Sequence, residues 1–337
     1  MKKPLLQLEN RVYRTYRGGK QLEALLGKSD PQDSFQPEDW ISSFVQAKNR
    51  DYIEGEGISR VLLDGRAVPI TEAVSAADFG PGREESGVLI KYLDSAERLG
   101  IQVHPTPEFS KKHFGTSYGK TECWHILSTD GDAAVYIGFK EGITRAKWKD
   151  LFDRQDVQGM LHAMHRFSVK AGDTVLVRAG TPHAIDAGCF LLEIQEPSDY
   201  TMNAEKITLA GVERTPQQIH YGVGEAAMLD CFIYEGLTEE ETREKCFLSA
   251  RPMAQAGHVA LVTYEDTPCF ALEKITRGPV HLTPSSFLTA VMLSDGSMTV
   301  GGTAYTVKRG EKYFIPYGCG EITVQDAQAI LCYPPRL

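Results

Sequence analysis

The stretch Ser168-Val169-Lys170-Ala171-Gly172-Asp173 decides the fold, because its pattern recurs 138 residues later as Thr306-Val307-Lys308-Arg309-Gly310-Glu311. Each copy is followed by a short apolar run and then by a glycine at the same place, Gly180 in the first copy and Gly318 in the second. Glycine beside a short acidic side chain favours a tight turn between two strands. The repeat therefore predicts one strand–turn–strand unit that occurs twice.

A strand, this turn, a second strand and a glycine turn form the hairpin pattern of a cupin-type barrel. Other β-rich runs are separated by Gly, Pro, Asn and Asp clusters, as in barrels and sandwiches. They lie at 61–63, 87–93, 133–139 and 190–195. The expected fold class is mainly β, with two cupin-type (double-stranded β-helix, jelly-roll) barrels and a small helical portion.

The repeat also divides the chain. We expect a metal-binding barrel over residues 1–204, a connecting segment over 205–244 and a second barrel over 245–337. The first barrel carries a helical insertion around 144–164, which begins with a Thr144 cap. Short helices are also expected at 21–26 and 38–47.

The composition excludes some function classes. With 337 residues, 42% hydrophobic and 24% charged, the chain has the make-up of an ordinary globular protein. Its net charge of −9 and pI near 5.6 argue against binding to nucleic acid or to an anionic membrane. The N-terminus lacks the apolar core of a signal peptide, and no apolar run is long enough to span a bilayer. Seven scattered cysteines without a C-x-x-C pair favour reduced thiols and a cytoplasmic location. The oligomeric state is left as monomer or homodimer.

Four polar side chains in strand-like runs point to a metal site. Gln102 and His104 are two apart in the strand-like stretch 101–104, so both leave the same face. Glu122 lies in a β-rich run, where a carboxylate needs a partner. His183 follows a Gly-Thr-Pro turn after the buried strand expected at 173–177. Each residue alone is more often a satisfied polar group. Together, one amide, two imidazoles and one carboxylate favour a divalent ion such as zinc, one per chain.

The second copy of the repeat lacks these ligands. Glu321 stands where His183 stands in the first copy, and no Q-x-H segment precedes it. The second barrel is therefore expected to be metal-free and structural.

Lys120 and Glu193 are the candidate catalytic residues. Lys120 precedes Glu122 by two positions and should project towards the same interior; the alternative is a lysine at the rim with its head in water. Glu193 shares a strand face with Gln195, and burial there would raise the pKa of its carboxyl and suit proton transfer. The alternative is a salt bridge between Glu193 and a neighbouring strand.

These motifs, in this order, resemble those of the type I phosphomannose isomerases (mannose-6-phosphate isomerases), which are zinc cupins with two β-barrels and a helical portion. The segments that carry the resemblance are QVHP at 102–105, GKTE at 119–122, GTPHAI at 180–185 and LEIQ at 192–195. The resemblance implies that Gln102, His104, Glu122 and His183 bind zinc, that Lys120 is a site lysine and that Glu193 is an acid/base. Glu38, in Pro37-Glu38-Asp39-Trp40, resembles the E-x-W segment that lies near the substrate in this family.

The resemblance therefore implies a zinc-dependent enzyme that interconverts mannose 6-phosphate and fructose 6-phosphate through an enediol, with a small sugar phosphate as its partner. Two positions depart from the family pattern. Gly100 replaces a serine that contacts phosphate, and Asn203 replaces an active-site arginine. The nearest cations in the sequence that could take over this role are Lys206, Arg178 and Arg214. These departures leave two alternatives open, namely an isomerase of another sugar or sugar phosphate, or a catalytically silent metal cupin that acts as a sugar sensor.

Overall fold

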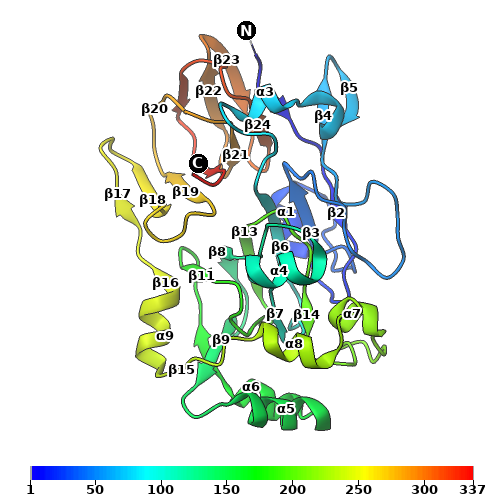
Figure 1. The fold of residues 1–337 in the computed structure, drawn as a ribbon. Helices are drawn as coiled ribbons and strands as arrows, with labels where there is room; N and C mark the ends of the chain where they lie inside the picture. Colours follow the sequence, from blue (N-terminus) through cyan, green and yellow to red (C-terminus); the bar gives the residue numbers. More distant parts are fainter. Residues whose placement is uncertain (1, 337) are drawn as a thin grey trace.

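The computed structural model describes residues 2–336 and contains two β-barrels, which are stacked one above the other in Figure 1. The N-terminal part of the chain builds most of the lower barrel, and the C-terminal strands build the upper one. The mainly β fold class expected from the sequence is confirmed. None of the helices in residues 2–336 is long and apolar enough to cross a membrane.

The first barrel consists of two sheets. The larger sheet has the strand order β16 (Phe247–Leu248), β11 (Thr174–Val177), β8 (Glu122–Thr129), β13 (Cys189–Gln195), β6 (Leu89–Ser95), β3 (Glu38–Ile41) and β2 (Arg11–Val12). The other has the order β10 (Met164–Ser168), β9 (Ala134–Lys140), β12 (His183–Ile185), β7 (Gln102–Val103) and β14 (Met202–Asn203), and β15 (Gly236–Leu237) pairs with β9 in parallel. The apolar side chains between the two sheets form the core of this barrel, which includes Trp124, Ile126, Ile137 and Val175.

The second barrel repeats this construction. Its larger sheet has the order β1 (Leu5–Leu6), β24 (Lys312–Ile315), β21 (Leu288–Met292), β26 (Ala329–Tyr333), β19 (Ala271–Ile275), β18 (His258–Val262) and β17 (Arg251–Pro252). Its smaller sheet has the order β20 (Val280–Leu282), β25 (Ile322–Gln325), β22 (Gly296–Val300) and β23 (Thr303–Val307). A separate hairpin joins β4 (Arg60–Leu63) to β5 (Arg66–Pro69).

The repeated motif forms the same turn in both barrels. The acidic side chain accepts a hydrogen bond from the backbone N–H of the lysine, from Lys170 to Asp173 at 3.0 Å and from Lys308 to Glu311 at 2.8 Å. The glycine before each acid has a left-handed φ, which a residue with a side chain adopts only at a cost. The expectation of a hairpin is wrong in one respect. The two strands that flank each turn join opposite sheets of a barrel instead of pairing with each other.

Nine helices surround the strands of residues 2–336. They are α1 (Lys20–Leu25), α2 (Ile70–Ala73), α3 (Ala76–Phe79), α4 (Pro107–Phe114), α5 (Arg145–Arg154), α6 (Val157–His162), α7 (Pro216–His220), α8 (Glu225–Cys231) and α9 (Glu239–Cys246). The Thr144 cap is confirmed, because its hydroxyl accepts a hydrogen bond from the Lys147 N–H. The helix expected over 38–47 is wrong: the segment begins as strand β3, whose four residues are all buried.

The two barrels share a core. Ile41, Leu192 and Ile194 from the first barrel join one apolar cluster with Phe270 and Phe314 from the second. Strands also cross between the barrels, since β1 pairs with β24 and β16 pairs with β11. We keep the domain boundaries at residues 204 and 245 as a proposal.

Candidate metal centre and the pocket around it

The strand pleat directs Glu122 into the first barrel. Along β8, Cys123 joins the core between the barrels, whereas Trp124 joins the core inside the first barrel. Successive side chains alternate across a strand, so Glu122 leaves β8 on the interior side with Trp124. The ring of Trp124 packs against that of His183, with centroids 5.6 Å apart.

The sequence motifs containing the two histidines are linked by the backbone. The N–H of Gly180, which has a φ of 83°, donates to the carbonyl of His104 at 2.8 Å. This bond anchors the Gly-Thr-Pro turn beside His104, and His183 then opens β12 directly after the turn. The turn thereby brings two ligand candidates that are far apart in sequence into ring contact, with centroids 4.7 Å apart.

His104, Glu122 and His183 form one buried cluster, and their donor atoms all lie within 4.8 Å of one another. The Nε2 atom of His104 is 3.0 Å from Oε2 of Glu122, and Nε2 of His183 is 3.3 Å from Oε1. Ligand atoms around a tetrahedral zinc ion, each at 2.0–2.1 Å, stand roughly 3.3 Å apart. Among residues 2–336, neither Glu122 Oε2 nor His183 Nε2 has a hydrogen bond of good geometry. The donor set therefore fits a metal ion.

Both imidazoles are oriented for ligation through Nε2. Nδ1 of His104 lies 3.1 Å from the carbonyl oxygen of Tyr200, and Nδ1 of His183 lies 2.9 Å from that of Thr181. A backbone carbonyl accepts only from an N–H, so each ring carries its proton on Nδ1 and a lone pair on Nε2. Burial lowers the pKa of both side chains, that of His104 well below its usual range, which favours the neutral form that binds metals.

Gln102 lies next to this cluster. It faces His183 across the β7–β12 pairing and lines the pocket described below. Its role as a fourth ligand remains a proposal that rests on this placement.

Lys120 reaches the same cluster, as expected from its spacing to Glu122. It is 4% exposed, and its Nζ lies 2.8 Å from Nε2 of His104 and 3.3 Å from Oε2 of Glu122. Burial lowers the pKa of its amine. Burial alone would raise the pKa of Glu122, but its neighbours, first among them the charge of Lys120, more than offset this and lower it. Lys120 is therefore buried beside the cluster and is not a rim lysine, and its catalytic role remains a proposal.

Glu193 makes the ion pair between strands that the sequence left open. Its register partner on β6 is Lys91, whose Nζ lies 2.8 Å from Oε2 of Glu193. Trp124 donates to Oε1 at 3.3 Å. Burial raises the pKa of the Glu193 carboxyl even though Lys91 opposes the shift. Because Glu193 also lines the pocket beside Lys120 and Glu122, pairing and catalysis are compatible.

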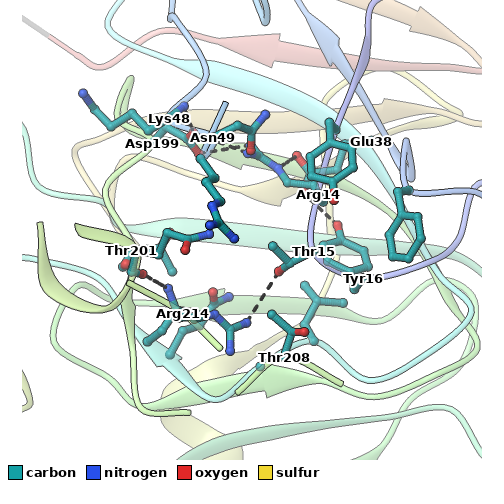
Figure 2. Close-up of a pocket in the computed structure, with 18 of the residues that line it drawn as sticks. Arg14, Thr15, Tyr16, Glu38, Lys48, Asn49, Asp199, Thr201, Thr208 and Arg214 are labelled. Atoms are coloured by element: carbon teal, nitrogen blue, oxygen red, sulfur yellow. Dashed lines mark hydrogen bonds and ion pairs between the residues drawn. The ribbon is translucent and has the colours of Figure 1, made fainter. Parts of the chain in front are cut away.

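Glu38 lies on β3 at the upper wall of the pocket in Figure 2, held by several donors. Tyr16 and Trp40 each donate to its carboxylate at 2.7 Å, and Nε of Arg14 lies 3.0 Å from it. Burial would raise its pKa, but Arg14, Lys91 and these hydrogen bonds outweigh burial and lower it to about 2. The carboxylate is therefore ionised, and it positions Arg14 and Lys91.

These side chains surround a cavity of about 560 Å³, a size typical of small-molecule sites. Its walls come from the strands that carry Gln102, Glu122 and Glu193 and from two loops, 48–51 and 208–214. Figure 2 shows Arg14, Thr15 and Tyr16 on one side and Thr201, Thr208 and Arg214 around the other.

Sequence reasoning missed Arg14, Lys91 and Asp199. Arg14 bridges two carboxylates, those of Glu38 and Asp199. Its Nη2 atom lies 3.1 Å from Oδ1 of Asp199. A signal was present for Lys91, which is a charge directly between the large hydrophobic residues Ile90 and Tyr92 of β6. No local pattern marks Arg14, because its partner Asp199 is 185 residues away.

Known proteins with similar sequences bear on this site. No protein-family model matches the chain. Mannose-6-phosphate isomerase ManA of Bacillus subtilis is 27% identical over 241 residues, which are 71% of each chain. Mannose-6-phosphate isomerase of Streptococcus mutans is 26% identical over 329 residues, covering 94% of this chain and 93% of the relative.

Solved structures show the same fold. The mannose 6-phosphate isomerase of Bacillus subtilis superposes with a TM-score of 0.78 at 20% identity, covering 98% of this chain and 100% of the other. A mutant phosphomannose isomerase of Salmonella typhimurium gives 0.73 at 14% identity, covering 99% and 100%. The chain is therefore a relative of the mannose-6-phosphate isomerases, and it has the two-barrel fold of the type I phosphomannose isomerases that its motifs resemble.

Proposed function

We propose that the protein is a zinc-dependent aldose–ketose isomerase that interconverts mannose 6-phosphate and fructose 6-phosphate. The observation that carries this proposal is the convergence of His104, Glu122 and His183 beside a cavity that Lys120 and Glu193 also line. The relatives named mannose-6-phosphate isomerases support the choice of reaction.

The reaction moves a proton between C1 and C2 of the open-chain sugar through an enediol, and negative charge develops on oxygen as the proton leaves. Zinc held by Gln102, His104, Glu122 and His183 would supply a Lewis acid for this charge. The amine of Lys120 lies 3.3 Å from Glu122 and can donate a hydrogen bond to the sugar oxygen on which the negative charge develops.

Glu193 is the proposed base. Its carboxylate accepts the proton from C2 of mannose 6-phosphate and returns it to C1. The proton of the C2 hydroxyl moves to O1 in the same conversion, which leaves a carbonyl at C2 and a hydroxyl at C1 and yields fructose 6-phosphate. A raised pKa makes the carboxylate a stronger base, and Lys91 at 2.8 Å supports the ionised form that the reaction needs.

The test measures fructose 6-phosphate formed from mannose 6-phosphate in a coupled assay, with metal content determined on the same sample. We expect about one zinc ion per chain, loss of activity after chelation and recovery when zinc is returned. Mixtures without the coupling enzymes and mixtures without the protein serve as blanks. Zinc-loaded protein that binds the sugar but does not isomerise it would contradict the proposal.

A further inference from the structure

Arg214 is a buried cation without a counter-ion. It is 7% exposed and lines the cavity, yet among residues 2–336 it makes no ion pair. Its Nη1 group donates to the backbone carbonyl of Glu205 at 3.0 Å, while the carboxylate of Glu205 is paired with Arg98. Its Nη2 group lies 3.5 Å from Thr15 Oγ1, a contact drawn as a dashed line in Figure 2. A buried charge normally needs a partner of opposite charge, and an anionic ligand in the cavity would provide one.

The other buried cations of the cavity already have carboxylate partners. Arg14 bridges Glu38 and Asp199, Lys91 pairs with Glu193, and Lys120 pairs with Glu122. Lys48 and Arg50 also line the cavity, but both side chains are exposed, so water screens their charges. Among residues 2–336, Arg214 is thus the buried cation of this cavity that has no carboxylate partner, so its charge is available to an anionic ligand.

Two neighbouring residues make room for this guanidinium. A β-carbon placed on Gly100 would lie 3.2 Å from Nη2 of Arg214, which is a tight contact. The φ of Gly100 is not left-handed, so space and not backbone conformation accounts for the glycine. Asn203 lies beyond it, with Oδ1 3.8 Å from that β-carbon. The Asn203 side chain is uncharged, and its amide nitrogen already donates to the backbone carbonyl of Gln218 at 2.7 Å.

The other two candidate cations lie elsewhere. Lys206 pairs with Glu225 and covers the ring of Phe152. Arg178 donates to backbone carbonyls of Lys245 and Asp266. Neither residue lines the cavity.

We propose that Arg214 binds the phosphoryl group of the substrate, and that Gly100 and Asn203 are the residues that accommodate it. This inference rests on the proposed function. The geometry suits a sugar phosphate, because Gly100 precedes the ligand candidate Gln102 by two residues, on the order of 7 Å along an extended chain. A phosphate on C6 lies at the opposite end of the sugar from C1 and C2, so its site must be separate from the metal.

The experiment compares Arg214→Gln with wild type, and uses Lys206→Gln as a control that removes a nearby charge outside the cavity. Zinc-loaded proteins are assayed with mannose 6-phosphate and with unphosphorylated mannose, and inorganic phosphate is tested as a competing ligand. We expect Arg214→Gln to raise KM for mannose 6-phosphate and the inhibition constant of phosphate by about tenfold to hundredfold. Zinc content should stay at the wild-type level, and any turnover of mannose should fall far less than that of mannose 6-phosphate.

Two further variants test the arrangement of the residues around Arg214. Gly100→Ser should raise KM for mannose 6-phosphate in the wild type and have little further effect beside Arg214→Gln, because both act on one guanidinium. Adding Asn203→Arg to Arg214→Gln should recover part of the lost affinity by restoring a cation. If Gly100→Ser and Arg214→Gln both keep wild-type KM, Arg214 is not the phosphate residue.

Failure of the proposed function gives a different result. A wild type that does not isomerise mannose 6-phosphate, but binds phosphate in calorimetry and loses that binding in Arg214→Gln, would overturn the reaction and keep the anion site. Equal phosphate binding by both proteins would overturn the anion site, whatever the reaction proves to be.

Discussion

Lys312 on β24 of the second barrel is ion-paired with Asp39 on β3 of the first, and both side chains are almost completely buried, at 2% and 0% exposed. Oδ1 of Asp39 also accepts a hydrogen bond from the N–H of Asn10 at 2.9 Å. A second polar contact lies between the barrels, where the hydroxyls of Ser42 and Thr289 are 2.6 Å apart. These contacts fix the register of the shared apolar core, because an unpaired charge there would be costly.

Lys312→Met should destabilise the protein by about 3–5 kcal/mol, because it leaves Asp39 charged, buried and without its cation. Urea unfolding followed by fluorescence measures the loss. Lys308→Met, which removes an exposed lysine from the neighbouring turn, is the matched control. Adding Asp39→Asn to Lys312→Met should cost less than the sum of the two single changes. A loss below about 1 kcal/mol for Lys312→Met would show that the pair contributes little.

The sequence could predict features that depend on local pattern. The repeated turn needs a left-handed glycine and an acid within four residues, so the letters alone reveal it. The metal cluster was also predictable, because the carboxylate of Glu122 in a β-rich run and His183 directly after a Gly-Thr-Pro turn are visible in the sequence. The placement of Arg14 and Arg214 was not, since their partners and neighbours come from distant segments. The segment after Glu38 failed as a helix because pairing with β2 and β6 decides its conformation.

Glu38 should contribute pH-dependent stability. Its pKa is lowered to about 2 in the fold, against about 4.3 for an unperturbed glutamate. A lowered pKa stabilises the folded state fully above the unfolded value, and the contribution is lost as the pH falls towards about 2. The shift corresponds to about 3 kcal/mol, of which about half should be lost by pH 3.

The measurement compares the free energy of unfolding of wild type and Glu38→Gln between pH 7 and pH 3. The gap between the two proteins should narrow as the pH falls, and Glu54→Gln, in an exposed loop, should show no such trend. A gap that stays constant over this range would mean that Arg14 and Lys91 do not hold the carboxylate ionised.

His183→Ala should reduce bound zinc from about one per chain to nearly none, because it removes one ligand from a site of three or four. The control is His125→Ala, another buried histidine, which contacts Thr174 at 3.0 Å and Lys274 at 3.4 Å on the side of the second barrel. Metal analysis after gel filtration should find full zinc in His125→Ala. Equal zinc in both variants would place the ion elsewhere.

Chelation should also lower the unfolding temperature of the wild type. Metal bound only to the folded state stabilises it by about 2.7 kcal/mol at a concentration of one hundred times Kd. The thermal shift should disappear in His183→Ala, which has no complete site to lose. Calorimetric scans with and without chelator measure both effects, and an identical shift in the two proteins would exclude the cluster as its source.

Glu193→Gln gives the most direct test of the base. The amide has nearly the same shape but cannot accept the C2 proton, so kcat should fall by about 10²- to 10⁴-fold. KM for mannose 6-phosphate should change little, and zinc should remain bound, because Glu193 is not a proposed ligand. Full kcat in this variant would assign the proton transfer to another group.

The pH profile separates a base from a residue that only supports the fold. In the wild type, kcat/KM should fall on the acid side with a pKa above the usual range of a glutamate, because burial raises the pKa of Glu193 and the reaction needs the ionised form. Lys91→Met removes the cation at 2.8 Å, so this acid limb should move to higher pH. Lys91→Arg keeps the charge and should leave the limb near its wild-type position. A limb that is unmoved in Lys91→Met would show that Glu193 is not the group whose ionisation controls the reaction.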